Sequence, residues 1–200
     1  MNCSRPIWIK RSDGLRREVP CGHCTMCRIQ RAREWATRCI HEAVYTESSA
    51  FCTLTYDEES LPKDCSVSKD ELQRFFKRLR KLWPVPLRYY ACGEYGEVRG
   101  RPHYHAIIFG LPPCDCPDWP ENERGKLQRT LCKCEGRRAV MKAWPFGGVS
   151  RLTLVCYDSA RYTADYIGKA YNGDLATRYY GTRQVPFQIM SKGLGRGYIS

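Results

Sequence analysis

The alternation of apolar and polar positions divides the chain into amphipathic helices and short strands. Residues 25–48 contain neither glycine nor proline and predict a long basic helix. A second helix is predicted to begin after Ser68, because Glu71, three residues later, completes a capping box. Pro84 ends this helix. Its apolar stripe consists of Leu72, Phe75, Phe76, Leu79, Leu82 and Trp83. The opposite face carries a candidate DNA-binding surface of four cations, Lys77, Arg78, Arg80 and Lys81.

Strands are predicted over residues 50–56, 87–93, 100–110 and 148–155, and a last helix over about 158–171. The second and third strands flank a glycine-containing turn and predict a hairpin. Antiparallel neighbours in the order α-β-α-β-β-β-α predict an α+β fold. We expect a two-layer sandwich, with a central antiparallel sheet and helices on its faces.

The 200 residues fit one domain, 1–200, with two cysteine-rich parts. Residues 1–28 form a turn-rich N-terminal segment, and residues 111–140, rich in proline and charge, predict an insertion rather than core. No apolar run reaches the roughly 18 residues of a membrane span, and no signal peptide opens the chain. The sequence therefore predicts a soluble intracellular protein without a membrane partner.

The net charge of +12 favours a polyanionic partner. Basic charge alone is weak evidence, because many basic proteins bind nothing in particular. The chain also has 13 tyrosines and 5 tryptophans, which are the side chains that stack on unpaired bases. Together these features favour single-stranded nucleic acid as the partner.

Two histidines lie in the predicted strand over residues 100–110. Strand side chains alternate between faces, so His103 and His105 point to the same side. Two adjacent imidazoles are candidate ligands for a metal, and a carboxylate of the preceding strand can add a third. Glu94 and Glu97 are both candidates, and Glu94, nearest the end of its strand, is preferred. Three ligands leave positions open, as a catalytic Mn²⁺ or Mg²⁺ requires.

The last predicted helix carries Tyr162, Tyr166 and Lys169. A spacing of four residues turns the two tyrosines about 40° apart with a rise of about 6 Å, and Lys169 falls on the same side. A phenol is a poor nucleophile until a metal or a cation stabilises its phenolate. Lys169 is three residues from Tyr166, which favours Tyr166 as the first nucleophile.

The odd count of 13 cysteines argues against a disulfide framework and for metal thiolates. A first group has spacing suited to tetrahedral zinc, with His23 as a less favoured ligand. It consists of Cys3, Cys21, Cys24 and Cys27. A second group brackets a 15-residue loop and consists of Cys114, Cys116, Cys132 and Cys134. We expect about two structural zinc ions.

Three strings of the chain resemble the motifs of rolling-circle replication initiators, the HUH endonucleases. They are Phe51-Cys-Thr-Leu-Thr-Tyr56, Arg101-Pro-His-Tyr-His105 and Tyr162-x-x-x-Tyr166-x-x-Lys169. The replication initiators of gokushoviruses, small single-stranded-DNA microviruses of bacteria, are similar over nearly all 200 residues. That similarity rests on Met1-Asn-Cys3, the cysteines of residues 19–28, Cys92-Gly-Glu-Tyr-Gly96 and Met190-Ser191. The segment around residues 114–134 departs from the family.

The resemblance implies a role for each candidate residue. His103, His105 and Glu94 would hold the divalent metal, and one tyrosine would cut single-stranded DNA at the origin through a 5′-phosphotyrosine. The second tyrosine would allow rejoining. A host polymerase would extend the 3′-hydroxyl, and a host helicase would unwind the duplex, in the cytoplasm of the bacterial host. Two alternatives remain open: an HUH transposase or relaxase, and a non-catalytic zinc-stabilised module that binds single-stranded nucleic acid.

Overall fold

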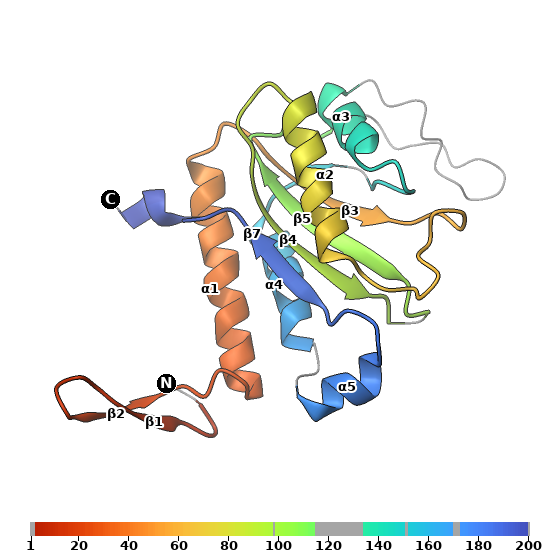
Figure 1. Ribbon diagram of the computed structural model, residues 1–200. Helices are drawn as coiled ribbons and strands as arrows, with labels where there is room; N and C mark the ends of the chain where they lie inside the picture. Colours follow the sequence, from red (N-terminus) through yellow and green to blue (C-terminus); the bar gives the residue numbers. More distant parts are fainter. Residues whose placement is uncertain (1–2, 98, 115–133, 151, 170–172, 200) are drawn as a thin grey trace.

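The computed structural model describes residues 3–97, 99–114, 134–150, 152–169 and 173–199 (Figure 1). Its strands are β1 (Ile7–Lys10), β2 (Arg16–Val19), β3 (Ser49–Thr55), β4 (Arg88–Tyr95), β5 (Pro102–Phe109), β6 (Thr153–Leu154) and β7 (Phe187–Met190). Its helices are α1 (Thr25–Val44), α2 (Lys69–Leu82), α3 (Glu135–Ala143), α4 (Tyr157–Lys169), α5 (Asp174–Tyr180) and the short 3₁₀ helix η2 (Arg196–Ile199).

Five strands form the central sheet in the order β6-β3-β5-β4-β7, and every neighbouring pair is antiparallel. The α+β class, the antiparallel sheet and the β4–β5 hairpin were predicted from the sequence, and all three are confirmed. The hairpin register places Glu94 directly opposite His103. Two strands outside this sheet, β1 and β2, form a separate hairpin.

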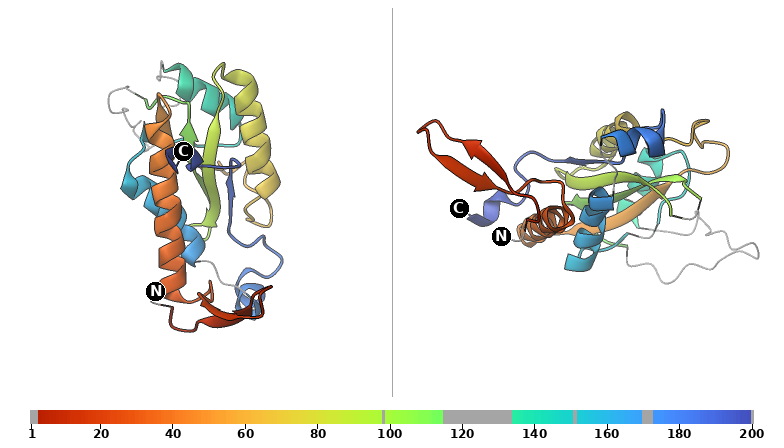
Figure 2. Two further views of the ribbon diagram at one scale, coloured as in Figure 1. Left: turned by 90° about the vertical axis from the view of Figure 1, so that its left-hand side faces the viewer. Right: turned by 90° about the horizontal axis from the view of Figure 1, so that it is seen from below.

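Helices cover both faces of the sheet (Figure 2). On one face α2 and α3 enclose a core that includes Leu54 and Ile108. On the other face α1 and α4 pack against each other over a second core that includes Ile107. The predicted two-layer sandwich is therefore wrong, and the molecule has three layers. Ile107 and Ile108 point to opposite faces and are both fully buried, as expected of a strand covered on both sides.

Helix α2 begins as predicted, but only half of its capping box forms. The Ser68 hydroxyl accepts a hydrogen bond from the Glu71 N–H at 3.1 Å. The Glu71 carboxylate instead accepts from Arg78 at 2.7 Å. The Ser68 N–H, which a complete box would pair with Glu71, donates to the Tyr104 hydroxyl at 2.8 Å. The predicted stripe is buried through Leu79, whereas Leu82, in the last turn, is exposed.

The region predicted as an insertion, residues 111–140, contributes to the core. Helix α3 occupies its end and buries Ala139 and Val140 against α2. The predicted strand over residues 148–155 is shorter than expected. It pairs with β3 through β6 and through a single bridge between Leu54 and Val149. Hairpin β1–β2, helix α5 and strand β7 were not predicted.

Candidate active site

Glu94, His103 and His105 converge on the sheet face that α4 covers. The candidate ligand atoms of the three side chains lie within 4.8 Å of one another. Glu94 Oε1 lies 3.0 Å from His105 Nε2 and also contacts His103 Nε2. Glu94 and His105 are each only 3% exposed. Two imidazoles and one carboxylate form a donor set suited to a divalent transition metal, so the residues present fit such an ion.

A second layer of contacts orients both imidazoles. His103 Nδ1 lies 3.1 Å from the Arg101 carbonyl oxygen, and His105 Nδ1 lies 3.0 Å from Thr53 Oγ1. With Nδ1 as the donor in both, each Nε2 keeps a lone pair directed at the cluster. Burial lowers the pKa of His103, but the hydrogen bond and charge of Glu94 outweigh it, so the net direction is upward.

The two tyrosines of α4 lie directly against this cluster. The ring of Tyr166 stacks on His105 at 5.1 Å between centroids, and the ring of Tyr162 meets His105 edge-on at 5.0 Å. The tyrosine rings lie 4.7 Å apart. The strand motif and the helix motif, distant in sequence, therefore meet at one place.

The environments of the two phenols differ. Tyr162 is 46% exposed, whereas Tyr166 is partly covered. Burial raises the pKa of Tyr166, and a hydrogen bond with Tyr162 and the charge of Glu94 raise it further. Lys169 ends α4, and its side chain lies outside the described part of the chain. Its predicted support of the Tyr166 phenolate therefore stays a prediction.

Strand β3 contributes two side chains that the sequence reasoning did not single out. Phe51 stacks on His105 at 5.9 Å and meets the edge of Tyr162 at 6.4 Å. Thr53 is the hydrogen-bond partner of His105 Nδ1. Both residues belong to the motif over residues 51–56, and the signal was their spacing of two, which places them on one face of a strand.

The candidate DNA-binding face of α2 does not belong to this site, because α2 covers the opposite face of the sheet. Two of its four cations are committed to the protein. Arg78 donates to the Ala143 carbonyl oxygen at 2.7 Å and pairs with Glu71. Arg80 lies over the Tyr89 ring and donates to the Leu87 carbonyl oxygen. Lys77 and Lys81 are exposed.

The first cysteine group also converges, and its ligand atoms lie within 4.8 Å of one another. The sulfur–sulfur distances are 3.8 Å for Cys3 with Cys24 and 4.0 Å for Cys21 with Cys27. A tetrahedral zinc with Zn–S bonds of about 2.3 Å separates its sulfurs by about 3.8 Å, so these residues fit zinc. The Cys27 N–H is the largest of several contacts that lower the pKa of the Cys24 thiol to about 5.

The other zinc predictions have mixed outcomes in the structure. His23 is exposed and does not join the cluster of four cysteines among the described residues. In the second group, the Cys114 and Cys134 sulfurs lie 3.4 Å apart. Cys116 and Cys132 fall outside the described residues, so the second site stays a prediction.

Residues 49–171 match the model of a family of replication-associated proteins of the ORF2 type. This match covers more than half of the chain and includes both β5 and α4, so the chain belongs to that family. It is 32% identical to the replication-associated protein ORF2 of Spiroplasma virus 4, over 90% of this chain and 57% of that protein. It is 34% identical to the replication-associated protein VP4 of Bdellovibrio phage phiMH2K, over 84% of this chain and 58% of that protein.

A third relative, the replication-associated protein ORF4 of Chlamydia phage 1, is 29% identical over 76% of this chain and 38% of its own length. The predicted resemblance to replication proteins of microviruses is confirmed. The chain spans less than two thirds of the length of each of these relatives. No solved structure matches it. Within the described ranges, no helix combines the length and apolar character that crossing a bilayer requires.

Proposed function

We propose that this chain is an HUH endonuclease that initiates rolling-circle replication by nicking and rejoining single-stranded DNA at an origin. The observation that carries the proposal is the convergence of two tyrosine rings on His105, within one site that also holds His103 and Glu94. The names of the relatives support a role in replication. A purely structural cluster would not need an exposed phenol beside a buried carboxylate and two imidazoles.

Glu94, His103 and His105 would hold Mn²⁺ or Mg²⁺, with imidazole favouring Mn²⁺. When bound, the ion supplies a Lewis acid that withdraws charge from a non-bridging oxygen of the scissile phosphate. The protein fixes the ligands through the Arg101 carbonyl and Thr53. The apolar ring of Phe51 packs against one side of His105 and limits the access of water there.

The tyrosines supply the chemistry that spares the bond energy of the cut strand. A tyrosine oxygen attacks the phosphorus, the bond from phosphorus to the 3′ oxygen breaks, and the leaving oxygen takes up the proton that the phenol lost. The 5′ phosphate is then esterified to tyrosine. Attack by a 3′-hydroxyl reverses the step, and the second tyrosine allows a new cut before the first ester is resolved. A host polymerase would extend the 3′ end and a host helicase would separate the strands, in the bacterial cytoplasm.

The experiment that tests the proposal is a covalent-adduct assay. Protein is incubated with single-stranded DNA libraries, including hairpin and origin-like sequences, labelled at either end, with Mn²⁺. We expect a labelled protein band on a denaturing gel only with the label on the 3′ side of the cut. A shift on native gels without any denaturation-resistant adduct would favour the non-catalytic binding module. Cleavage restricted to hairpins that resemble element ends would favour a transposase or relaxase.

We also propose zinc at Cys3, Cys21, Cys24 and Cys27, and a second zinc held by Cys114 and Cys134 with Cys116 and Cys132. Protein purified under reducing conditions is expected to contain about two zinc ions per chain by elemental analysis. The Cys21→Ser variant should lose one of them, because three thiolates bind the ion more weakly than four. Cys39→Ser, which changes a buried cysteine outside both groups, is the control and should keep both. Absence of zinc from the metal-replete wild type would contradict both sites.

A further inference from the structure

The N-terminal hairpin, β1 and β2, has almost no packed side chains. All four residues of β1 are exposed, and in β2 only Val19 is partly covered. A two-stranded hairpin is marginally stable on its own in water. Cys3 precedes β1 and Cys21 follows β2, and both belong to the cluster with Cys24 and Cys27 at the start of α1. The cysteine cluster therefore closes the base of the hairpin and ties it to α1.

The exposed side chains of this hairpin are unusual for a spacer. Trp8 and Leu15 are each 65% exposed, and Ile7 and Ile9 are also exposed. Residues 3–20 carry five Lys or Arg against two Asp or Glu. Large exposed apolar side chains among cations indicate a binding surface rather than a solvated connection. A polyanion with flat apolar groups, as in unpaired bases on a phosphate backbone, complements both features.

The strand register sorts these side chains onto two faces. Trp8 pairs with Glu18 across the strands, and Lys10 pairs with Arg16. Cross-strand partners and alternate residues share a face, so all four lie on the same one, which keeps a net positive charge. An indole beside two cations offers a stacking platform together with two phosphate contacts. The other face carries Ile7, Ile9, Arg17 and Val19.

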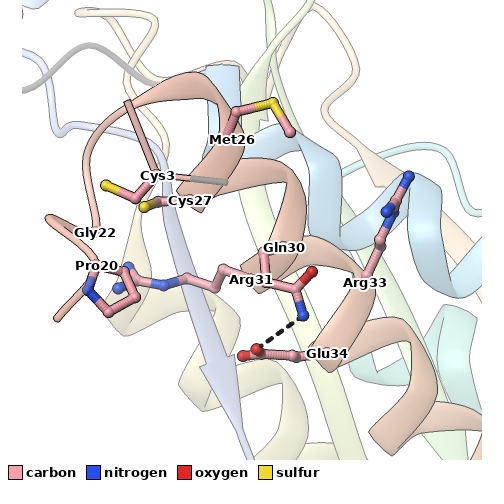
Figure 3. Close-up of a pocket in the computed structure, with 9 residues that line it drawn as sticks. All are labelled: Cys3, Pro20, Gly22, Met26, Cys27, Gln30, Arg31, Arg33 and Glu34. Atoms are coloured by element: carbon pink, nitrogen blue, oxygen red, sulfur yellow. Dashed lines mark hydrogen bonds between the residues drawn. The ribbon is translucent and has the colours of Figure 1, made fainter. Parts of the chain in front are cut away.

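The basic surface continues from the hairpin onto α1. A pocket of about 690 Å³ lies where the cysteine cluster meets the first turns of α1 (Figure 3). Arg31 and Arg33 both line this pocket, and Glu34, the acidic residue of its lining, accepts a hydrogen bond from Gln30 at 3.2 Å. In Figure 1 the hairpin projects from the N-terminal end of α1, at the same end of the molecule as α5, which follows the tyrosine helix α4.

We propose that the hairpin is a DNA-binding arm, in which Trp8 stacks on an unpaired base while Lys10 and Arg16 contact phosphates of the same strand. The identity of the polyanion rests on the proposed function. The arm lies outside the nicking site and binds a part of the strand that does not react. The cysteine cluster fixes the arm to α1, so the arm and the tyrosine helix, which packs on α1, keep a constant relation.

The test is single-strand binding measured by fluorescence anisotropy over a range of salt concentrations. All proteins carry Tyr162→Phe and Tyr166→Phe, so no covalent product forms. Lys10→Ala with Arg16→Ala is compared with Lys77→Ala and Lys81→Ala on α2, which removes the same charge from another exposed surface. We expect the hairpin pair to lower the salt-dependence slope by about 1.4, at about 0.7 per phosphate contact, and the α2 pair to leave it unchanged.

A second comparison separates stacking from apolar contact in general. Trp8→Ala should weaken binding roughly tenfold or more, because one stacked base is lost. Leu15→Ala, which removes an equally exposed apolar side chain from the same hairpin, should have little effect. Trp8→Phe should restore part of the loss. The melting temperature should stay unchanged in all of them, because these side chains do not pack on the core.

Three outcomes would overturn the arm. The first is equal effects of Trp8→Ala and Leu15→Ala, and the second is equal slopes for the hairpin pair and the α2 pair. The third is a change in oligomeric state on ultracentrifugation, which would assign the surface to a second copy of the chain. A wild-type protein that binds DNA through Trp8 but forms no covalent adduct would instead overturn the proposed function and leave the arm in place.

Discussion

Replacing both Tyr162 and Tyr166 with Phe is expected to abolish the covalent protein–DNA adduct completely. Only two hydroxyl groups are lost, and the aromatic contacts with His105 and Phe51 remain available, so the fold should be preserved. The rings of both tyrosines contact His105, which makes these two phenols the candidate nucleophiles beside the metal-ligand cluster. The measurement is the adduct band on a denaturing gel with labelled single-stranded DNA and Mn²⁺.

The single variants assign the order of the two nucleophiles. Tyr166 stacks on His105, so Tyr166→Phe should lose first-strand nicking and Tyr162→Phe should keep it, while rejoining should need both phenols. Tyr157→Phe is a matched control, because Tyr157 lies on the same helix and is 45% exposed, close to the 46% of Tyr162. A double variant that still becomes linked to DNA would exclude this pair as the nucleophiles.

Replacing His103 or His105 with Ala is expected to reduce nicking by at least about a hundredfold, since a bound metal contributes several kcal/mol to charge stabilisation. Binding of single-stranded DNA should change little, because cationic surface side chains supply most of the affinity. Initial nicking rates at saturating Mn²⁺, together with anisotropy titrations, measure the two effects separately.

His23→Ala provides the control for the loss of an imidazole, since His23 is exposed and outside the Glu94 cluster. Its nicking rate should equal that of the wild type. Undiminished cleavage by His105→Ala would remove the metal mechanism. A parallel loss of nicking and of DNA binding would instead assign the histidines a role in holding the fold or the strand.

The parts of the fold that were predictable from sequence are those with strong local patterns. Helix α2 combines the Ser68 cap with a stripe of large apolar residues, and β5 carries two histidines one residue apart on a strand bounded by Gly and Pro. The choice of Glu94 over Glu97 followed from hairpin geometry. The structure places Glu94 in the cluster, and Glu97 is exposed in the turn.

The features that were missed depend on contacts between distant residues. Helix α3 buries small side chains such as Ala139 and Ala143, which give a weak pattern within a charged segment. The run Ala106-Ile107-Ile108-Phe109 signals burial on both faces of the sheet, and this run is what requires the third layer. Hairpin β1–β2 has no buried face, so hydrophobic alternation alone could not identify it.

The position of Glu94 opposite His103 in the β4–β5 hairpin has a consequence for how the protein assembles. All three proposed metal ligands lie between residues 94 and 105 and depend on one local strand pairing. The nascent chain can therefore form this half of the site before α4 has been synthesised. The tyrosines join it later through the connection that includes residues 115–133. Changes in the length of that connection leave the pairing of Glu94 with His103 untouched, so relatives can diverge there while they retain the same chemistry.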